Sequence, residues 1–219
     1  MKIYAFGDIH GEYYKLTKLV SRLNITNDDL LVFLGDYIDR GEHSFEVIDY
    51  LCDLAKKYTC VFLRGNHELM LRDFMLGLDT DRLYTYNGGR TTIMSYDVHG
   101  YYIGEQESNI PETHMKFLQR LKPYYETDDF IFAHAGISPY KSMEEQTDDE
   151  LYWDRDFNYE DYKGPKTVVY GHTPYNEVLN KTYQICIDTG ACFRSMGDLT
   201  CVELPERIFT KQGQTKKEG

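Results

Sequence analysis

The spacing of hydrophobic positions along this chain changes several times and divides it into strands and helices. Short continuous apolar runs, which are typical of buried strands, occupy residues 3–6, 30–34, 60–63, 130–133 and 167–170. Apolar residues recur at helical spacing after the first two of these runs, at Leu16, Leu19, Val20 and Leu23, and then at Phe45, Ile48, Leu51, Cys52 and Ala55. The first part of the chain therefore predicts successive β-α-β crossovers.

Two more helices are expected in the middle of the chain. One follows Asn66 and ends before Gly77, and the other begins at Pro111, with Met115, Leu118 and Leu121 facing the core. The last third is rich in β-formers at residues 183–187 and 199–204, which we expect to be antiparallel strands that complete a second sheet. The pattern predicts one domain over residues 1–210 and a disordered tail over 211–219.

Composition agrees with a single domain and limits its partners. The chain has 219 residues, of which 42% are hydrophobic and 15% aromatic, enough for a full core. Its formal charge of −12 argues against binding to nucleic acid or to an anionic membrane surface, since both favour Lys and Arg. A phosphate site must then be made positive locally, by metals and a few arginines. We expect a monomer.

Cysteine usage favours a reducing compartment. The five cysteines are odd in number and widely spaced and form no C-x-x-C pair, so neither a disulfide framework nor a zinc finger is indicated. The N-terminus leads directly into the first strand without an apolar signal segment, and no apolar run approaches the length that spans a bilayer. We expect a cytoplasmic protein.

Each of the five strand-like runs is followed by a side chain that binds metals. These side chains are Asp8 with His10, Asp36, Asn66, His134 and His172. Loops at the carboxyl edge of an α/β sheet commonly carry chemistry, so strands laid side by side would bring all six to one rim. Mixed imidazole, carboxylate and amide donors favour borderline divalent ions. The sequence predicts a centre of two divalent metal ions, with Mn²⁺ expected first and Fe or Zn as alternatives.

Five ordered motifs carry a family resemblance. Residues 7–11 (GDIHG), 35–41 (GDYIDRG), 65–68 (GNHE), 134–136 (HAG) and 171–173 (GHT) resemble the signature of the phosphoprotein phosphatase family of metallophosphoesterases. Residues 153–155 (WDR) and 187–191 (IDTGA) are similar to its bacterial and phage branch, which includes the phage lambda protein phosphatase. The resemblance implies the calcineurin-like α/β fold, a central two-sheet β-sandwich flanked by helices.

The resemblance also implies roles for the metal-binding side chains. Asp8, His10 and Asp36 would hold the first ion, and Asp36 would bridge to a second ion held by Asn66, His134 and His172. Two such ions share a water, lower its pKa and orient a phosphoryl group, so that metal-bound hydroxide attacks phosphorus in line.

Four further residues receive catalytic or phosphate-binding roles from the resemblance. His67 is the expected general acid, and Asp39 would orient its ring, although a cap of the helix beginning near Gly41 is an alternative role for Asp39. Arg40 and Arg155 would clamp the phosphate oxygens, because guanidinium groups match phosphate geometry.

Residues 87–96 offer a candidate contact to the substrate. They resemble a segment of bacterial phosphatases and of diadenosine tetraphosphate hydrolases in the same family, which makes Arg90 a candidate substrate contact. The main hypothesis is a metal-dependent phosphomonoesterase that acts on phosphoserine and phosphothreonine, and in a dual-specificity form on phosphotyrosine, in proteins or peptides. The alternative is a hydrolase of dinucleoside polyphosphates or other nucleotides. A non-catalytic scaffold on the same fold is a third hypothesis, against which the intact His67 and Asp39 argue.

Overall fold

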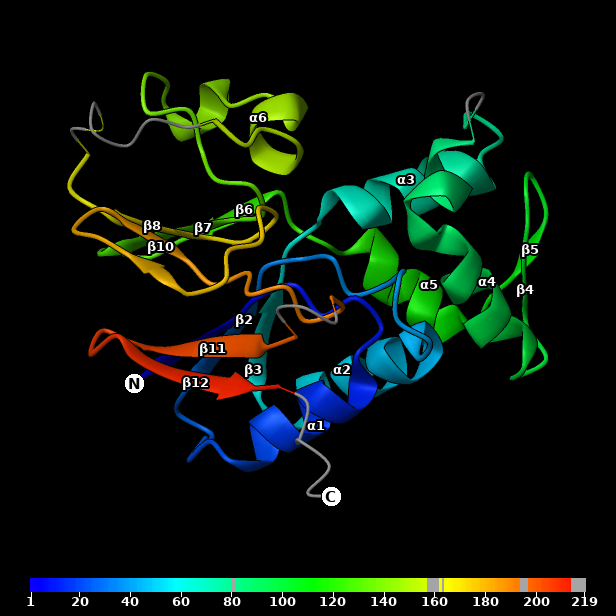
Figure 1. The fold of residues 1–219 in the computed structure, drawn as a ribbon, viewed down its shortest axis with the longest axis horizontal. Coiled ribbons are helices and arrows are strands. Elements are labelled where there is room, and N and C mark those ends of the chain that lie inside the picture. Colours follow the sequence, from blue (N-terminus) through cyan, green and yellow to red (C-terminus); the bar gives the residue numbers. More distant parts are fainter. Residues whose placement is uncertain (80–81, 157–161, 163, 194–196, 214–219) are drawn as a thin grey trace.

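In the computed structural model of the chain, two five-stranded sheets stack face to face (Figure 1). The structure describes residues 1–79, 82–156, 162, 164–193 and 197–213. The first sheet has the order β12-β11-β1-β2-β3, in which β1, β2 and β3 are parallel and β11 and β12 are antiparallel to their neighbours. Its strands are β1 Ile3–Phe6, β2 Leu30–Phe33, β3 Thr59–Phe62, β11 Leu199–Leu204 and β12 Ile208–Gln212.

The second sheet has the order β6-β7-β8-β10-β9 and is also mixed. Strands β7, β8 and β10 run parallel to one another, and β6 and β9 pair antiparallel at its edges. Its strands are β6 Tyr124–Glu126, β7 Phe130–Ala133, β8 Thr167–Tyr170, β9 Leu179–Asn180 and β10 Gln184–Cys186.

Alternation along the central strands explains why every residue of β1 is buried. Ile3 and Ala5 face the second sheet, in a cluster that includes Phe132 and Val169, whereas Tyr4 and Phe6 pack on the opposite side. Successive side chains of a strand point to opposite faces, so a strand covered on both faces is apolar throughout. These continuous runs are what made the strands detectable in the sequence.

Helices cover the outer faces of the sandwich. Helices α1 (Tyr13–Ser21) and α2 (Ser44–Lys57) pack on the first sheet through apolar stripes that contain Leu16 and Leu51. Helix α6 (Asp148–Tyr152), preceded by the 3-10 turn Met143–Glu145, lies over the second sheet through Leu151. The chain thus forms an α/β sandwich, and the predicted two-sheet fold flanked by helices is confirmed.

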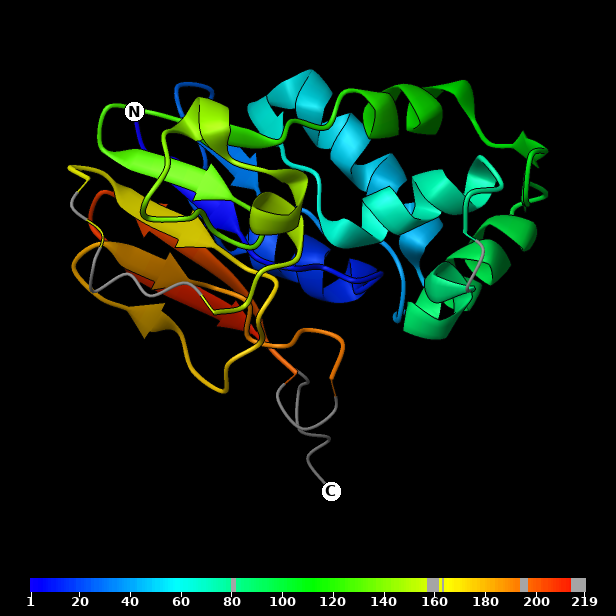
Figure 2. The ribbon, with the colours of Figure 1, turned by 90° about the horizontal axis from the view of Figure 1, so that it is seen from above.

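A helical cap lies beside the sandwich, at the right of Figure 1 and, from above, of Figure 2. Its helices α3 and α4 and the β4–β5 hairpin lie between β3 and α5 in the chain, and a short helical segment, Thr85–Gly89, leads into α4 through a kink at Gly88, where φ is 105°. The elements of the cap are α3 Asn66–Met75, α4 Arg90–Asp97, β4 Tyr102–Ile103, β5 Ser108–Asn109 and α5 Glu112–Gln119.

Three sequence expectations are corrected by the structure. The segments 183–187 and 199–204 do not pair with each other: β10 is parallel to β8 in the second sheet, while β11 is antiparallel to β1 in the first. Helix α5 buries His114 and Phe117 rather than Met115. Strand β12 continues to Gln212, so the domain extends past residue 210, and residues 214–219 of the predicted tail lie outside the described residues.

The structure bears on the state of the cysteines and on membrane-spanning helices. All five cysteines are free thiols. Within the described ranges, no helix is long and apolar enough to cross a membrane.

Candidate metal centre

The loops that follow β1, β2, β3, β7 and β8 meet at one end of the sandwich, and several of their residues, among them His10, Asp36 and His172, adopt left-handed backbone conformations. The φ angles are 48° at His10, 51° at Asp36 and 64° at His172. A positive φ in a residue other than glycine costs free energy and persists only where surrounding contacts fix it, which is characteristic of functional sites. Since β1 to β3 belong to one sheet and β7 and β8 to the other, the rim is shared by both sheets.

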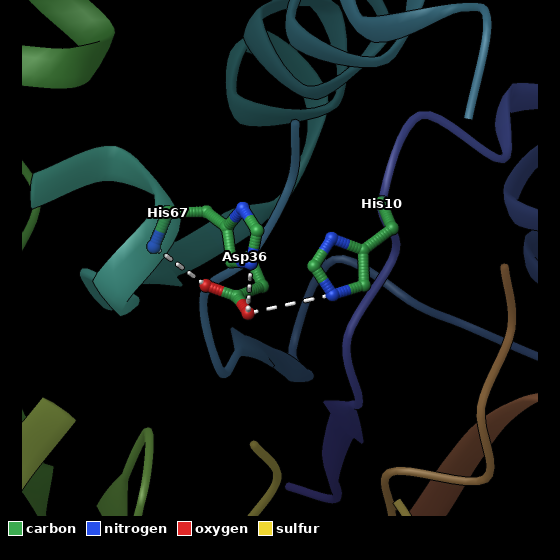
Figure 3. Close-up of side chains that lie close together, drawn as sticks. All are labelled: His10, Asp36 and His67. Atoms are coloured by element: carbon green, nitrogen blue, oxygen red, sulfur yellow. Dashed lines mark hydrogen bonds and ion pairs between the residues drawn. The ribbon is translucent and has the colours of Figure 1, made fainter. Parts of the chain in front are cut away.

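Asp36 lies at the centre of two groups of potential metal ligands. The first contains His10 and His67, and the second contains His134 and His172. The Nε2 atoms of His10 and His134 are each 3.4 Å from a different carboxylate oxygen of Asp36. Figure 3 shows the first group, with the rings of His10 and His67 on two sides of the carboxylate. One carboxylate facing two sets of imidazoles is the arrangement expected of a bridging ligand.

Asn66 joins the second group through its amide oxygen. This Oδ1 atom is 3.0 Å from Nε2 of His134 and 3.1 Å from Nδ1 of His172. Asn66 begins α3, directly after Gly65, where the chain turns from β3 into the helix. The predicted set of Asp36, Asn66, His134 and His172 therefore converges on one point.

Asp8 lies beside the centre but outside both groups of ligands. Its two carboxylate oxygens accept hydrogen bonds from the backbone N–H of His172, at 3.2 and 3.1 Å. Burial, together with the nearby charges of Asp188 and Asp36, raises its pKa well above the usual value. Asp188, also buried, was missed by the sequence analysis, although it lies in the IDTGA segment that carried part of the resemblance.

Hydrogen bonds behind the cluster orient its rings and its carboxylate. Nδ1 of His10 donates to the carbonyl of Ile38 at 2.9 Å and Nδ1 of His134 to that of Leu34 at 3.0 Å, in the tautomer that leaves each Nε2 as a ligand. The buried Glu68 carboxylate accepts from the backbone N–H groups of Asp36, Tyr37 and Gly65. Glu68 thus supports the loop that carries Asp36.

The electrostatics of the cluster suit divalent metal ions. Burial lowers the pKa of His134, and it lowers the pKa of His172 to about 3, so both rings are neutral at pH 7. Burial alone would raise the pKa of Asp36, but the surrounding histidines lower it below the usual value, and the carboxylate is ionised. Neutral imidazoles, an ionised carboxylate and an amide oxygen are the protonation states and donor types that borderline divalent ions bind. The residues present fit a dinuclear centre.

His67 differs from His10 and His134 because its Nδ1 is hydrogen-bonded to a carboxylate rather than to a backbone carbonyl. Its Nδ1 is 2.7 Å from Oδ2 of Asp39, and both side chains are buried. Burial opposes the charged form of His67, but attraction to Asp36 and the hydrogen bond with Asp39 outweigh it and raise the pKa. Asp39 does not cap α2, which starts at Ser44 after an uncapped His43, so the alternative role is excluded.

Thr92 of the cap fixes the other oxygen of Asp39. Its hydroxyl donates to Oδ1 of Asp39 at 2.6 Å and accepts from the Asp39 backbone N–H at 2.9 Å. The hydroxyl of Ser44 is a second acceptor for that N–H, at 3.1 Å. Sequence reasoning missed Thr92, because no strand or spacing pattern connects it to a residue 53 positions earlier.

The three arginines singled out from the sequence take different positions. Nη1 of Arg40 is 2.9 Å from Nε2 of His10, and Nη1 of Arg155 donates to the backbone carbonyl of His172 at 3.2 Å. Both guanidinium groups therefore border the cluster. Arg90 opens α4 with an exposed side chain, two residues after Gly88, whose backbone packs against Arg40.

The known proteins that this chain resembles include phosphoesterases. The calcineurin-like phosphoesterase family matches residues 1–177. The asymmetrical bis(5'-nucleosyl)-tetraphosphatase PrpE of Halalkalibacterium halodurans is 30% identical over 95% of this chain and 92% of its own length. A crystal structure of a putative diadenosine tetraphosphatase has a TM-score of 0.72 at 22% identity, and the match covers 98% of this chain and 94% of that one.

A protein phosphatase is also similar in fold. The cold-active protein-tyrosine phosphatase of a psychrophilic Shewanella has a TM-score of 0.68 at 18% identity, covering 96% of this chain and 80% of its own. At that identity the likeness shows the fold alone.

The chain belongs to the calcineurin-like phosphoesterases, as the sequence resemblance indicated. It is a metallophosphoesterase, a hydrolase of phosphate esters from a family that uses a dinuclear divalent metal centre, and its structure supplies ligand groups for such a centre around Asp36. The sequence analysis preferred a protein phosphatase. The relatives favour its alternative, a hydrolase of dinucleoside polyphosphates.

Proposed function

We propose that this protein hydrolyses dinucleoside polyphosphates and that it splits a four-phosphate chain asymmetrically. The observation that carries the proposal is the likeness to asymmetrical bis(5'-nucleosyl)-tetraphosphatases, which extends over 94–95% of this chain and so includes the cap as well as the metal centre. The likeness to protein phosphatases supports the same chemistry but, at 15–18% identity, does not support their substrates.

We propose the same metal ligands that the resemblance to the phosphoprotein phosphatase family implies. Two divalent ions, which we propose to be Mn²⁺, would supply charge neutralisation of the phosphoryl oxygens and a water of lowered pKa. Asp36 would bridge them, with His10 and Asp8 on one side. The ligands on the other side would be Asn66, His134 and His172.

The residues around the centre would bind the phosphate oxygens and protonate the leaving group. Arg40 and Arg155 border the cluster from two sides, so their guanidinium groups would hold the non-bridging oxygens of the phosphate under attack. His67, whose raised pKa keeps a proton available near neutral pH, would protonate the leaving oxygen. Asp39 holds Nδ1 of His67 and so leaves Nε2, which faces Asp36 at 3.9 Å, as the nitrogen directed to the substrate.

The reaction balances as a simple hydrolysis. Water adds its oxygen to phosphorus, the bond from that phosphorus to a bridging oxygen breaks, and the leaving phosphate takes the proton. A four-phosphate chain between two nucleosides divides unequally in only one way that leaves both products phosphorylated. The products are a nucleoside monophosphate and a nucleoside triphosphate.

The test is a side-by-side assay of the metal-stripped protein reloaded with Mn²⁺. Diadenosine tetraphosphate, a phosphoserine peptide and a phosphotyrosine peptide are supplied at equal concentrations, and products are separated by chromatography. We expect AMP and ATP in equal amounts, at a rate well above phosphate release from either peptide. Asp36→Asn is the control for contaminating hydrolases. Faster turnover of the peptides would return the protein to the protein phosphatase hypothesis, and formation of ADP alone would contradict asymmetrical cleavage.

A further inference from the structure

A cavity of about 330 Å³ opens beside the metal centre, between the start of α1, the loop after Arg40 and residues Cys192 and Phe193. Its size falls within the range of small-ligand sites, roughly 300–1,000 Å³. Tyr14, His43 and Phe193 contribute aromatic rings to its lining, and Arg40 contributes a guanidinium group. None of these three aromatic residues has a role in the chemistry derived above.

Two of the aromatic side chains that line the cavity are exposed. Tyr14 is 68% exposed and packs edge-on against His43, with ring centroids 5.0 Å apart and an interplanar angle of 81°. Phe193 is 38% exposed, and the guanidinium carbon of Arg40 lies 5.4 Å from the centroid of its ring. Exposed aromatic faces around a polar cavity are typical of surfaces on which nucleobases stack.

Arg40 connects the cavity to the metal centre. Arg40 lines the cavity, and Nη1 of its guanidinium lies 2.9 Å from Nε2 of His10. Gly11 and Gly41 allow the two loops to approach closely, because a Cβ at either would overlap backbone atoms of the other loop. A ligand whose phosphate contacts Arg40 can therefore extend into the cavity without crossing an intervening element.

The charges of the cavity favour an uncharged group over additional phosphates. Lys15 also lines it, but its ammonium is already bound to Glu12, at 3.2 Å, and to the carbonyl of Ala191. The carboxylates of Glu12 and Glu42 would repel phosphate and can accept hydrogen bonds from hydroxyl or amino groups. A flat base on a hydroxyl-bearing sugar has these properties.

We propose that this cavity binds the nucleoside nearest to the phosphate under attack, with its base stacked on Tyr14 and Phe193. The inference rests on the proposed function and makes it more specific. A one-plus-three split places one nucleoside at most one phosphate away from the attacked phosphorus. A cavity that shares Arg40 with the metal centre lies within reach of that nucleoside.

Inhibition of p-nitrophenyl phosphate hydrolysis measures nucleoside binding without requiring dinucleotide turnover. AMP and ribose 5-phosphate carry the same phosphate and sugar and differ by the base. For the Mn²⁺-loaded enzyme we expect AMP to inhibit at least about tenfold more tightly, as alanine substitutions at stacked bases indicate. Tyr14→Ala and Phe193→Ala should each remove most of this advantage, whereas Tyr14→Phe should keep it. Tyr102→Ala, which alters an exposed tyrosine on β4 in the cap, is the matched control.

The outcomes separate the two proposals. Equal inhibition of the wild-type enzyme by AMP and ribose 5-phosphate would overturn the nucleoside cavity, whatever the enzyme does to diadenosine tetraphosphate. An AMP advantage that persists in correctly folded Tyr14→Ala and Phe193→Ala would overturn it as well. An advantage that these substitutions remove, in an enzyme that does not cleave diadenosine tetraphosphate, would support the cavity and refute the proposed substrate.

Discussion

Asp39 and His67 form a buried hydrogen-bonded pair, in which Oδ2 of Asp39 lies 2.7 Å from Nδ1 of His67. The pair bridges two segments of the sequence, the loop after β2 and the start of α3. The remaining oxygen of Asp39 binds the Thr92 hydroxyl, so the orientation of the histidine depends on a residue of the helical cap. This relationship ties the cap to the proposed chemistry and leads to the first prediction.

Thr92→Val should reduce kcat about tenfold with little change in KM, since a misplaced catalytic group can lose that much or more. Valine has nearly the same shape but leaves Oδ1 of Asp39 and the Asp39 N–H without the threonine hydroxyl. Steady-state kinetics on diadenosine tetraphosphate at several pH values is the measurement. Thr92→Ser, which keeps the hydroxyl, should restore kcat and the pH profile; if Ser and Val variants lose activity equally, Thr92 acts only through packing.

His67→Asn should reduce turnover in proportion to the basicity of the leaving group. A general acid contributes roughly 10²–10⁴-fold when the leaving oxygen needs a proton and much less when it does not. Phenyl phosphate, whose leaving phenol has a pKa of about 10, should therefore lose far more kcat than p-nitrophenyl phosphate. Metal content, measured by mass spectrometry of the digested protein, should stay at the wild-type value. Equal losses on both substrates would argue against an acid role.

Asp36→Asn should remove both metal ions and nearly all activity, because one carboxylate faces both groups of ligands. His10→Asn should weaken one ion selectively, since His10 belongs to only one group. Metal-to-protein ratios after dialysis distinguish the two variants. Asp53→Asn, at an exposed position of α2, is the control and should retain both ions. Retention of one full equivalent by Asp36→Asn would contradict a bridging role.

The stability of the cap should fall below about pH 6.5 because of His114. Its ring is buried against Tyr96, whose hydroxyl is 2.9 Å from Nδ1, and burial lowers its pKa below the usual 6.5 in spite of the opposing attraction of Asp49. As the pH falls through 6.5, the unfolded chain takes up a proton at this ring before the folded chain does. The free energy of unfolding should therefore decrease from pH 7 towards pH 5.

Denaturant unfolding of His114→Asn checks this sign. The variant should be less stable at pH 7, because it loses the bond to Tyr96, but its stability should vary less with pH than that of the wild type. A slope unchanged in His114→Asn would mean that other groups cause the acid loss.

Many strands and helices of the fold were predictable because the local spacing of apolar residues indicates them. Strands covered on both faces are apolar throughout, so continuous apolar runs such as residues 3–6 and 130–133 are recognisable as strands from the sequence. Apolar residues at helical spacing likewise predicted α1 and α2. The ordered motifs also identified the family, since short polar segments after buried strands are constrained by chemistry rather than by packing. The residues around Asp36 were found in this way.

The pairing of strands from distant segments could not be predicted from the sequence. Nothing local in residues 199–204 indicates that they cross to the first sheet and lie antiparallel to β1, because an apolar strand can pair with either sheet. The same holds for the rim itself, which two sheets share rather than one. Strand order is decided by which arrangement buries both faces, and that is a property of the whole chain.

The sequence by itself determined the class of chemistry, because metal-ligating side chains and their order along the chain are written in it. The tertiary structure alone decided that Thr92 supports Asp39 and that Tyr14 and Phe193 line one cavity beside Arg40. Such contacts join residues far apart in sequence, and their geometry is fixed only when the sheets and the cap pack together. In our proposals, substrate preference depends on such long-range contacts, whereas the motifs by themselves indicate only a hydrolase of phosphate esters.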